Sequence, residues 1–379
     1  MHKIKVFSSL FNIKKAEWQN LLEDASPFCS YEFLGALEET GCIGENKGQV
    51  PLYFTLWEDD LRACFIVFVK SHSYGEYIFD WAWADAFARY QVPYYPKLCS
   101  QVPFTPVTDP KFLIHKDYKN KNYAEILLEH VFEVSKTLKT SSIHSLYIPE
   151  REKQHFEKKG FLLRKGHQYH FENNGYKNFS DFLKTLEKRK RKQIQKERNF
   201  IIKEANLQIK TYTGSDLDDS KAETWFEFYE STILKKRSFA YLNLEFFKSI
   251  FRDLSSHVLF VCAYFEDKPV AGSLFLYNDK VLYGRYWGAI KEFKFLHFEL
   301  CYYQGIDFAL SKGLKRFEAG AQGEHKIKRG FLPKVIWSAH YIENKSFKEA
   351  IEKFIEDEGK SLENFLDYVS QKEDPFKKE

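Results

Sequence analysis

The chain has 379 residues, of which 44% are hydrophobic and 18% aromatic, so it can bury the cores of two ordinary domains. The formal net charge is only +4, so the overall charge of the protein does not indicate binding to polyanions. No apolar run approaches the roughly 20 residues that a membrane-spanning helix needs, and the first residues lack a signal-peptide pattern. We therefore expect a cytoplasmic protein with no membrane span.

Six cysteines lie far apart in the sequence, and none forms a C-x-x-C pair. Several of them fall inside apolar stretches, where a reduced cysteine serves as a small hydrophobic side chain. The sequence therefore predicts neither a disulfide framework nor a metal site.

The first half begins with a helical pattern over residues 14–39, which three glycines then end. Strands are expected at 52–57 and 62–70, joined by a polar turn, and a third short strand at 76–80. Residues 81–110 contain five prolines among aromatic residues and cannot form one regular element. The remaining predicted elements of this half are a helix at 122–138, a strand at 142–148, a helix at 150–159 and a strand at 161–171.

A basic helical connector at 179–206 separates the two halves. From Lys188 to Arg198 it is almost entirely basic and amide-bearing, so the predicted helix is polar all round for about two turns. A solvated helix is one interpretation; the other is a site for the phosphates of tRNA, of a nucleotide-linked precursor or of lipid headgroups. We expect anion binding by Lys188, Arg189, Arg191 and Lys192.

The second half, 207–379, repeats the order of elements more completely than the first half, 1–178. Its pattern predicts a strand at 207–212, helices at 215–235 and 244–254, and three antiparallel strands at 258–265, 269–277 and 281–287. A helix at 295–311, strands at 315–318 and 335–342, and an amphipathic helix at 346–369 that packs on this half complete the prediction.

This order resembles the GNAT N-acyltransferase fold, and two such halves around a basic helical element resemble the Fem family. Four stretches are similar to the FemAB-like family of predicted N-acyltransferases, associated with peptidoglycan and cell-wall biogenesis: residues 77–87, 284–288, 297–307 and 318–333. The resemblance implies an α/β (α+β) fold of two tandem GNAT-like domains, each a mixed sheet flanked by helices. It also implies transfer of an acyl or aminoacyl group from an activated donor to an amine acceptor.

The donor is expected to be aminoacyl-tRNA or acyl-CoA, with no cofactor bound tightly. CoA-dependent GNAT enzymes are similar to one another in a glycine-rich turn after the meander, whose N–H groups hold pyrophosphate. Here that junction, from Gly288 to Phe295, contains a single glycine. The alternatives are therefore a CoA-dependent N-acetyltransferase with an altered pyrophosphate loop, or a non-catalytic module that recognises a cell-wall fragment or RNA.

The stretch after the predicted strand at 315–318 is rich in glycine and in charged side chains, and it follows the strand at the same end of the sheet as the start of the 295–311 helix. The resemblance places the acyl site at that end. Candidate bases are Glu318, Glu324 and His325. The expected substrate-binding residues of this half are Arg285, Trp287, His297, Glu299, Tyr302, Gln322, Lys326 and Arg329. Ion pairing, packing and turn formation are the structural alternatives for each of them.

A second aromatic and acidic group lies in the first half. Trp81 and Asp85 lead into the proline-rich segment, and tryptophan beside a carboxylate suits a sugar or a cationic ligand. The other interpretation is an aromatic plug that closes the first half.

Overall fold

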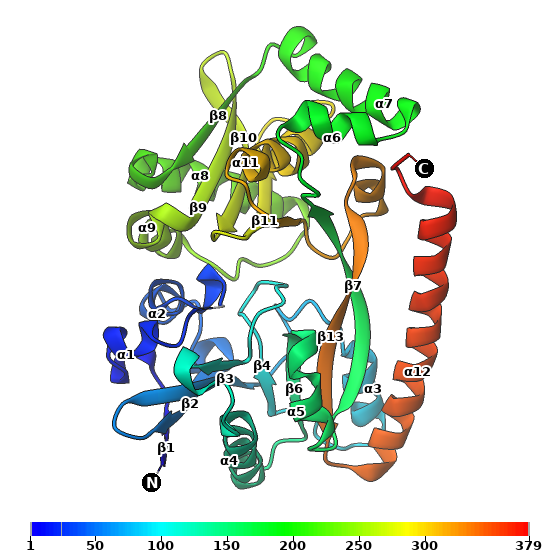
Figure 1. Ribbon diagram of the computed structural model, residues 1–379. Coiled ribbons are helices and arrows are strands. Elements are labelled where there is room, and N and C mark those ends of the chain that lie inside the picture. Colours follow the sequence, from blue (N-terminus) through cyan, green and yellow to red (C-terminus); the bar gives the residue numbers. More distant parts are fainter. Residues whose placement is uncertain (1, 24, 378–379) are drawn as a thin grey trace. The chain divides into compact units, whose positions relative to one another are not determined.

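The computed structural model describes residues 2–23 and 25–377, which form two compact units (Figure 1). Unit 1 contains residues 1–166 and 335–363, and unit 2 contains residues 167–334 and 364–379. Each unit is a mixed sheet flanked by helices, which confirms the α/β class. The division at 178 and 206 that the sequence suggests stays a prediction.

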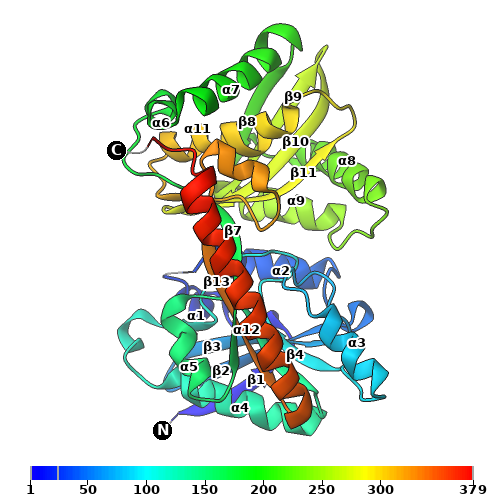
Figure 2. The same ribbon diagram turned by 90° about the vertical axis from the view of Figure 1, so that its right-hand side faces the viewer.

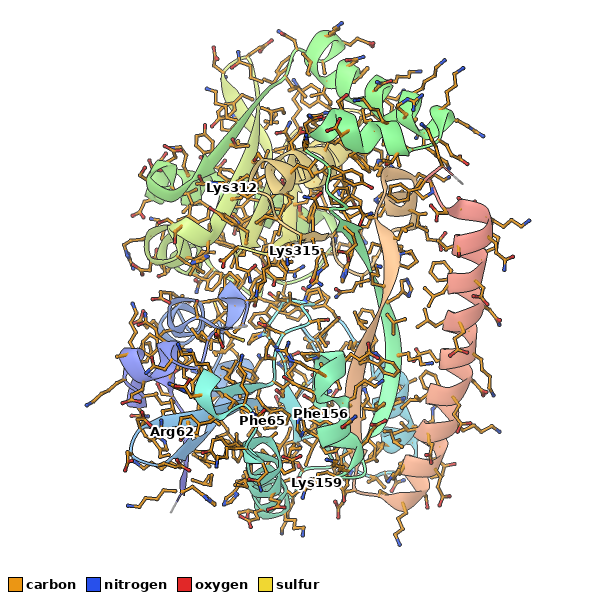
Figure 3. The ribbon with its side chains drawn as sticks, viewed as in Figure 1. Arg62, Phe65, Phe156, Lys159, Lys312 and Lys315 are labelled. Atoms are coloured by element: carbon orange, nitrogen blue, oxygen red, sulfur yellow. The ribbon has the colours of Figure 1, made fainter. Side chains whose placement is uncertain are left out.

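Unit 1 has its strands in the spatial order β1 (Lys3–Phe7), β2 (Gln49–Trp57), β3 (Leu61–Lys70), β4 (Lys97–Ser100), β6 (Ser142–Ile148) and β13 (Leu332–Ile342), with β5 (Phe112–Ile114) beside β3. Its helices are α1 (Lys15–Gln19), α2 (Tyr31–Glu39), α3 (Trp81–Arg89), α4 (Tyr123–Leu138) and α5 (Lys153–Glu157). Alternation along β2 and β3 sends Phe54 and Phe65 into one core, where they meet α4 and Phe156 of α5 (Figure 3).

Two expectations for this unit are wrong in detail. The helix expected over 14–39 is two helices, because residues 20–23 and 25–30 form turns and a 3-10 segment around Pro27. The strand expected at 76–80 is a loop, and β4 takes its place as the antiparallel neighbour of β3. The proline-rich segment is not one regular element, as expected, and it contains the separate elements α3 and β4.

Unit 2 has the strand order β7 (Leu162–Glu172), β12 (Arg316–Glu318), β11 (Val281–Ala289), β10 (Lys268–Tyr277), β9 (Val258–Phe265) and β8 (Gln208–Thr213). The meander β9–β10–β11 is antiparallel, as predicted from its two polar turns. The helices are α6 (Phe179–Thr185), α7 (Lys188–Asn199), α8 (Asp219–Lys235), α9 (Leu244–Asp253), α10 (Leu296–Phe298) and α11 (Gln304–Ser311).

Helices cover both faces of the unit 2 sheet (Figure 2). A Cβ atom added to Gly272 of β10 would meet Phe228 of α8, so this glycine lets α8 lie close on one face. Ser273, which alternation places on the other face, donates a hydrogen bond of 2.8 Å to the Leu300 carbonyl. Leu300 belongs to a π-helical turn, Glu299–Tyr303, that joins α10 to α11 within the predicted 295–311 helix.

The two units share one order of elements. A first strand and two helices precede a three-strand antiparallel meander, and then a helix leads to a strand parallel to the third meander strand, β6 beside β4 and β12 beside β11. Each sheet then takes an antiparallel strand from the other half of the sequence, since β13 pairs with β6 and β7 pairs with β12. Both units are discontinuous in sequence because residues 335–363, which include most of β13, belong to unit 1 and the chain then returns to unit 2.

The last helix, α12 (Lys345–Tyr368), differs from the expected packing on the second half. Its residues up to Glu363 belong to unit 1, where Ile351 and Phe347 pack with Trp83 and Phe87 of α3. Of the helices in the described part of the chain, none combines the length and the apolar character needed to cross a membrane.

Candidate functional site

The candidate site of unit 2 lies where β12 separates from β11. The two strands pair in parallel only from Val281 with Arg316 to Tyr283 with Glu318. Beyond this point the chain after β12 stays with β7, through hydrogen bonds between Ala319 or Gly320 and Tyr169. β11 continues to Ala289, and the side chains of Ser231 and Thr232 of α8 donate to the carbonyls of Ala289 and Trp287. The segment after Glu318 is therefore free to fold back along the sheet end.

Glu318 closes β12 and is completely buried. Its carboxylate lies 2.9 Å from Nη2 of Arg316 and 3.9 Å from Nη2 of Arg285, whose side chain is also buried. Arg285 sits on β11 and also donates to the Gly284 carbonyl. The two predicted site residues thus come together, and ion pairing explains the burial of Glu318 without a role as base.

Lys326 is the most unusual cation of this group. Its side chain is buried, and Nζ donates to the carbonyl oxygens of Ala319, at 2.6 Å, and Gly320, at 3.3 Å. Burial lowers the pKa of Lys326 to about 8, and the nearby charge of Arg285 acts in the same direction. Within the described residues no carboxylate forms an ion pair with Lys326. Nζ also lies over the Tyr169 ring, 5.4 Å from its centroid. A buried ammonium held by carbonyl oxygens and a ring, with no carboxylate to neutralise it, can attract a further oxygen that carries negative charge.

Four predicted side chains form a continuous cluster of rings beside this lysine. His297 of α10 contacts Trp287 of β11 with ring centroids 5.2 Å apart, Tyr302 at 5.4 Å and His325 at 6.0 Å. The Tyr302 hydroxyl and Nε2 of His325 are 2.9 Å apart, within hydrogen-bonding distance. The structure therefore brings β11, α10, the π-helical turn and the 3-10 helix Glu324–Arg329 together at one place.

Both histidines of the cluster are disposed to be neutral. Burial lowers the pKa of His297 to about 4, with further lowering by His325, Lys326, Arg329 and Lys236. Partial burial also lowers the pKa of His325, whose side chain is exposed on one side, and the charges of Arg329 and Lys326 add to the effect. A neutral imidazole can accept a proton, so the cluster contains groups that can act as a general base.

Glu299 and Arg329 lie in buried ion pairs with helix α7. Glu299 accepts from Arg198 at 3.1 Å and from Gln304 at 2.7 Å. Arg329 donates twice to Glu197 at 2.9 Å and once to the Tyr303 hydroxyl at 2.9 Å. These contacts join α7 to the body of unit 2 and explain both residues structurally.

Sequence reasoning missed Glu197 and Arg198 as partners. They follow Ile194, the one buried apolar residue of the basic helix, by three and four positions, which places them on its inward face. That spacing is the signal that could have identified them.

Other predicted residues lie at the surface. Gln322 and Glu324 are exposed, in the loop and 3-10 helix after β12. Lys188, Arg189 and Lys192 are exposed on α7, whereas Arg191 is half-buried and donates to the Leu186 carbonyl. Trp81 and Asp85 are exposed in unit 1, on α3. Across residues 2–23 and 25–377, no group of three or more His, Cys, Asp and Glu side chains is arranged to hold a metal ion.

Solved structures with the same fold are known, at low sequence identity. The crystal structure of FemX matches with a TM-score of 0.56 and 12% identity, covering 92% of this chain and 100% of FemX. L-PGS from Bacillus licheniformis matches with a TM-score of 0.52 and 10% identity, over 85% of this chain and 95% of L-PGS. The C-terminal domain of a putative lysylphosphatidylglycerol synthetase from Agrobacterium fabrum matches with a TM-score of 0.51 and 8% identity, over 90% of this chain and 95% of that domain.

These likenesses show the fold, two tandem GNAT-like halves. No curated protein matches the chain in sequence. The model of the FemAB-like family, described as peptidoglycan biosynthesis/recognition, matches residues 9–378. The chain belongs to the FemAB-like family.

Proposed function

We propose that the protein is an N-acyltransferase that moves an acyl or aminoacyl group onto an amine of a cell-wall precursor, and that its reacting site is the unit 2 cluster. The observation that carries the proposal is the buried ammonium of Lys326, held by two carbonyl oxygens beside the ring cluster. The family's description and the name lysylphosphatidylglycerol synthetase, which denotes an aminoacylated product, agree with this chemistry.

Lys326 is the group proposed to stabilise the transition state. When the amine nitrogen attacks the acyl carbon, the carbonyl oxygen gains negative charge. An ammonium already out of water interacts with that charge strongly, and removing one such donor typically slows acyl transfer by about 10²–10³-fold. With a pKa of about 8, Lys326 is mostly protonated near neutral pH.

The histidine pair is proposed to receive the proton of the attacking amine. As the new C–N bond forms and the bond from the acyl carbon to the leaving oxygen or sulfur breaks, the nitrogen loses a proton. His297 and His325 are disposed to be neutral by burial and by nearby cations, so either ring offers an accepting nitrogen. The Tyr302 hydroxyl fixes the position of His325.

The backbone after the meander supports an aminoacyl donor over acyl-CoA. The first N–H groups of the helix that would hold pyrophosphate are already engaged, since Leu296 donates to Phe293, and Phe298 and Glu299 donate to Phe295. A pyrophosphate would have to replace these bonds. The exposed cations of α7, among them Lys188, Arg189 and Lys192, would contact the phosphates of a tRNA-borne donor.

The test is a transfer assay with the purified chain. We expect product when charged tRNA and an amine-bearing cell-wall precursor are supplied, and none when acetyl-CoA replaces the charged tRNA. Transfer from acetyl-CoA alone would favour the CoA-dependent alternative. Binding of the precursor without turnover of any donor would identify a recognition module and contradict the proposed reaction.

A further inference from the structure

The loop Ser73–Trp81 of unit 1, here called the aromatic loop, has buried polar side chains and exposed aromatic side chains. Its polar residues Ser73, Glu76 and Asp80 are buried. Its aromatic residues point outward, with exposed fractions of 43% for Tyr74, 37% for Tyr77, 54% for Phe79 and 39% for Trp81. This is the reverse of the usual preference of these residue types, so the arrangement needs a cause.

Two completely buried lysines hold the inward side. Lys97 of β4 donates to Ser73 at 2.7 Å and to Glu76 at 2.9 Å, and it forms an ion pair with Asp80. Lys70 of β3 lies 3.3 Å from Glu76. Burial alone would raise the pKa of Asp80, but the charge of Lys97 outweighs it and brings that pKa to about 2.

The backbone of the loop is fastened as well. Lys70 donates to the Tyr74 carbonyl at 2.9 Å, and Nη1 of Arg164 donates to the Phe79 carbonyl at 2.9 Å. Arg164 is itself held by both carboxylate oxygens of Glu358. The loop is thus fixed at both ends and between them, and its aromatic side chains project from a rigid backbone.

Such an arrangement suits recognition, because buried ion pairs rarely add net stability over apolar packing. What these pairs do add is a fixed geometry, which lowers the entropy that a ligand must overcome. The rings are also close together, with Tyr74 and Trp81 centroids 5.3 Å apart and His72 5.2 Å from Tyr74. A contiguous exposed aromatic patch on a soluble domain commonly marks a binding surface.

The charge of the patch indicates a neutral ligand. Between Ser71 and Arg89 the exposed charged residues are Asp85 and Arg89, which cancel. Asp85 and Arg89 follow Trp81 by four and eight residues in α3, so they lie on the same side of this helix as Trp81. The face therefore combines aromatic rings with one carboxylate and one guanidinium group, and these residues give it no excess charge to attract a polyanion or a polycation.

We propose that the aromatic loop, with Asp85 and Arg89, is a binding site for a neutral saccharide. The C–H face of a pyranose ring stacks on Tyr74 and Trp81, and the sugar hydroxyls donate to Asp85 and accept from Arg89. Together with the proposed function, on which this part rests, the site would hold the glycan portion of the amine acceptor.

The experiment is isothermal titration of the full-length chain, without any acyl donor, with a neutral tetramer of β-1,4-linked N-acetylglucosamine. We expect binding that falls about tenfold or more in Trp81→Ala and in Tyr74→Ala and is largely kept in Trp81→Phe. Tyr90→Ala is the matched control, because Tyr90 is 76% exposed but caps the opposite end of α3 from Trp81, and this variant should bind as the wild type does.

Equal affinity of Trp81→Ala and the wild type, or no binding of the tetramer by the wild type, would overturn the proposal. Binding only of the cationic, deacetylated tetramer would overturn it too, since that result would show a cation site. Because no donor is present, these outcomes do not depend on acyl transfer. Conversely, a wild-type protein that binds the tetramer but transfers no acyl group would contradict the proposed function and leave the saccharide site standing.

Discussion

Lys97 of unit 1 and Lys326 of unit 2 are both buried, but their surroundings are opposite. Lys97 of unit 1 is completely buried against Glu76 and Asp80, and these carboxylates raise its pKa against the effect of burial. Lys326 of unit 2 is 5% exposed and meets carbonyl oxygens and the cation Arg285, and its pKa falls to about 8. A buried lysine that is paired with carboxylates holds the structure in place. A buried lysine that has no carboxylate partner can still form an ion pair with a ligand.

The same contrast holds within helix α7. Its inward residues Glu197 and Arg198 are matched by Arg329, and by Glu299 and Asp307. Its outward residues Lys188, Arg189 and Lys192 face solvent. The inward pairs attach the helix, and the outward cations are the part available to a phosphate-bearing partner.

The largest effect is expected for Lys97→Met. It leaves Glu76 and Asp80 buried without their shared cation, so the free energy of unfolding should fall by about 3–5 kcal/mol. Lys184→Met removes an exposed ion pair with Asp181 and should change the free energy of unfolding by less than about 0.5 kcal/mol. Denaturant unfolding of both variants measures the difference, and equal stabilities would show that Lys97 does not hold the aromatic loop.

Arg329→Ala should come next, with a loss of about 3 kcal/mol, because Glu197 stays buried without its partner. The sequence alone predicts a change within about 1 kcal/mol and a loss of function only. The buried pair with Glu197 predicts the larger loss of stability instead. Glu324→Gln is the control, since Glu324 is exposed and its loss should leave the melting temperature unchanged. A stable Arg329→Ala protein would return Arg329 to the list of ligand-binding candidates.

The titration of Lys326 should appear as a pH dependence of stability. Its folded pKa lies below the usual 10.5, so between pH 8 and about 10.5 the unfolded chain binds more protons at this residue. Stability contributed by this group must therefore rise with pH across that window. Measured against Lys326→Met, the wild type should gain about 2 kcal/mol, and a flat difference would mean that Lys326 titrates normally.

The smallest effect concerns the outer face of α7. Replacing Lys188, Arg189 and Lys192 with Gln should weaken tRNA binding and reduce the slope of log affinity against log salt by about one unit per lost contact. The control changes Lys345, Lys353 and Lys360 of α12 to Gln, which removes the same charge from another exposed helix. Identical slopes for the two triple variants would show that α7 is only a solvated surface.

Most of the fold of unit 2 was predictable because local patterns determine it. The meander strands alternate or run continuously apolar between turns of Asp, Asn and Lys, and the helices begin at side-chain caps such as Asp218 and Asn243. Residues 76–80 misled the same reasoning. Glu76 and Asp80 alternate with aromatic residues like a strand, but their burial depends on Lys97, and a single sequence does not show that contact.

The candidate site was predictable in part for a similar reason. Trp287, His297, Tyr302 and His325 converge because each follows directly from a strand or helix end of the GNAT-like order. The partners of Glu299 and Arg329 lie 101 and 132 residues away, which no local pattern reveals. Only these long-range ion pairs show that Glu299 and Arg329 have structural partners, in contrast to the candidate functional residues of the ring cluster.

The most direct test of the account compares Lys326→Met with Lys328→Met in single-turnover transfer from charged tRNA. Lys328 is exposed in the same 3-10 helix, so its variant controls for charge and for local sequence. We predict that Lys326→Met folds at least as stably as the wild type and transfers about 10²-fold or more slowly, while Lys328→Met keeps the wild-type rate. Wild-type turnover by a folded Lys326→Met protein would contradict the claim that this unmatched lysine serves the reaction.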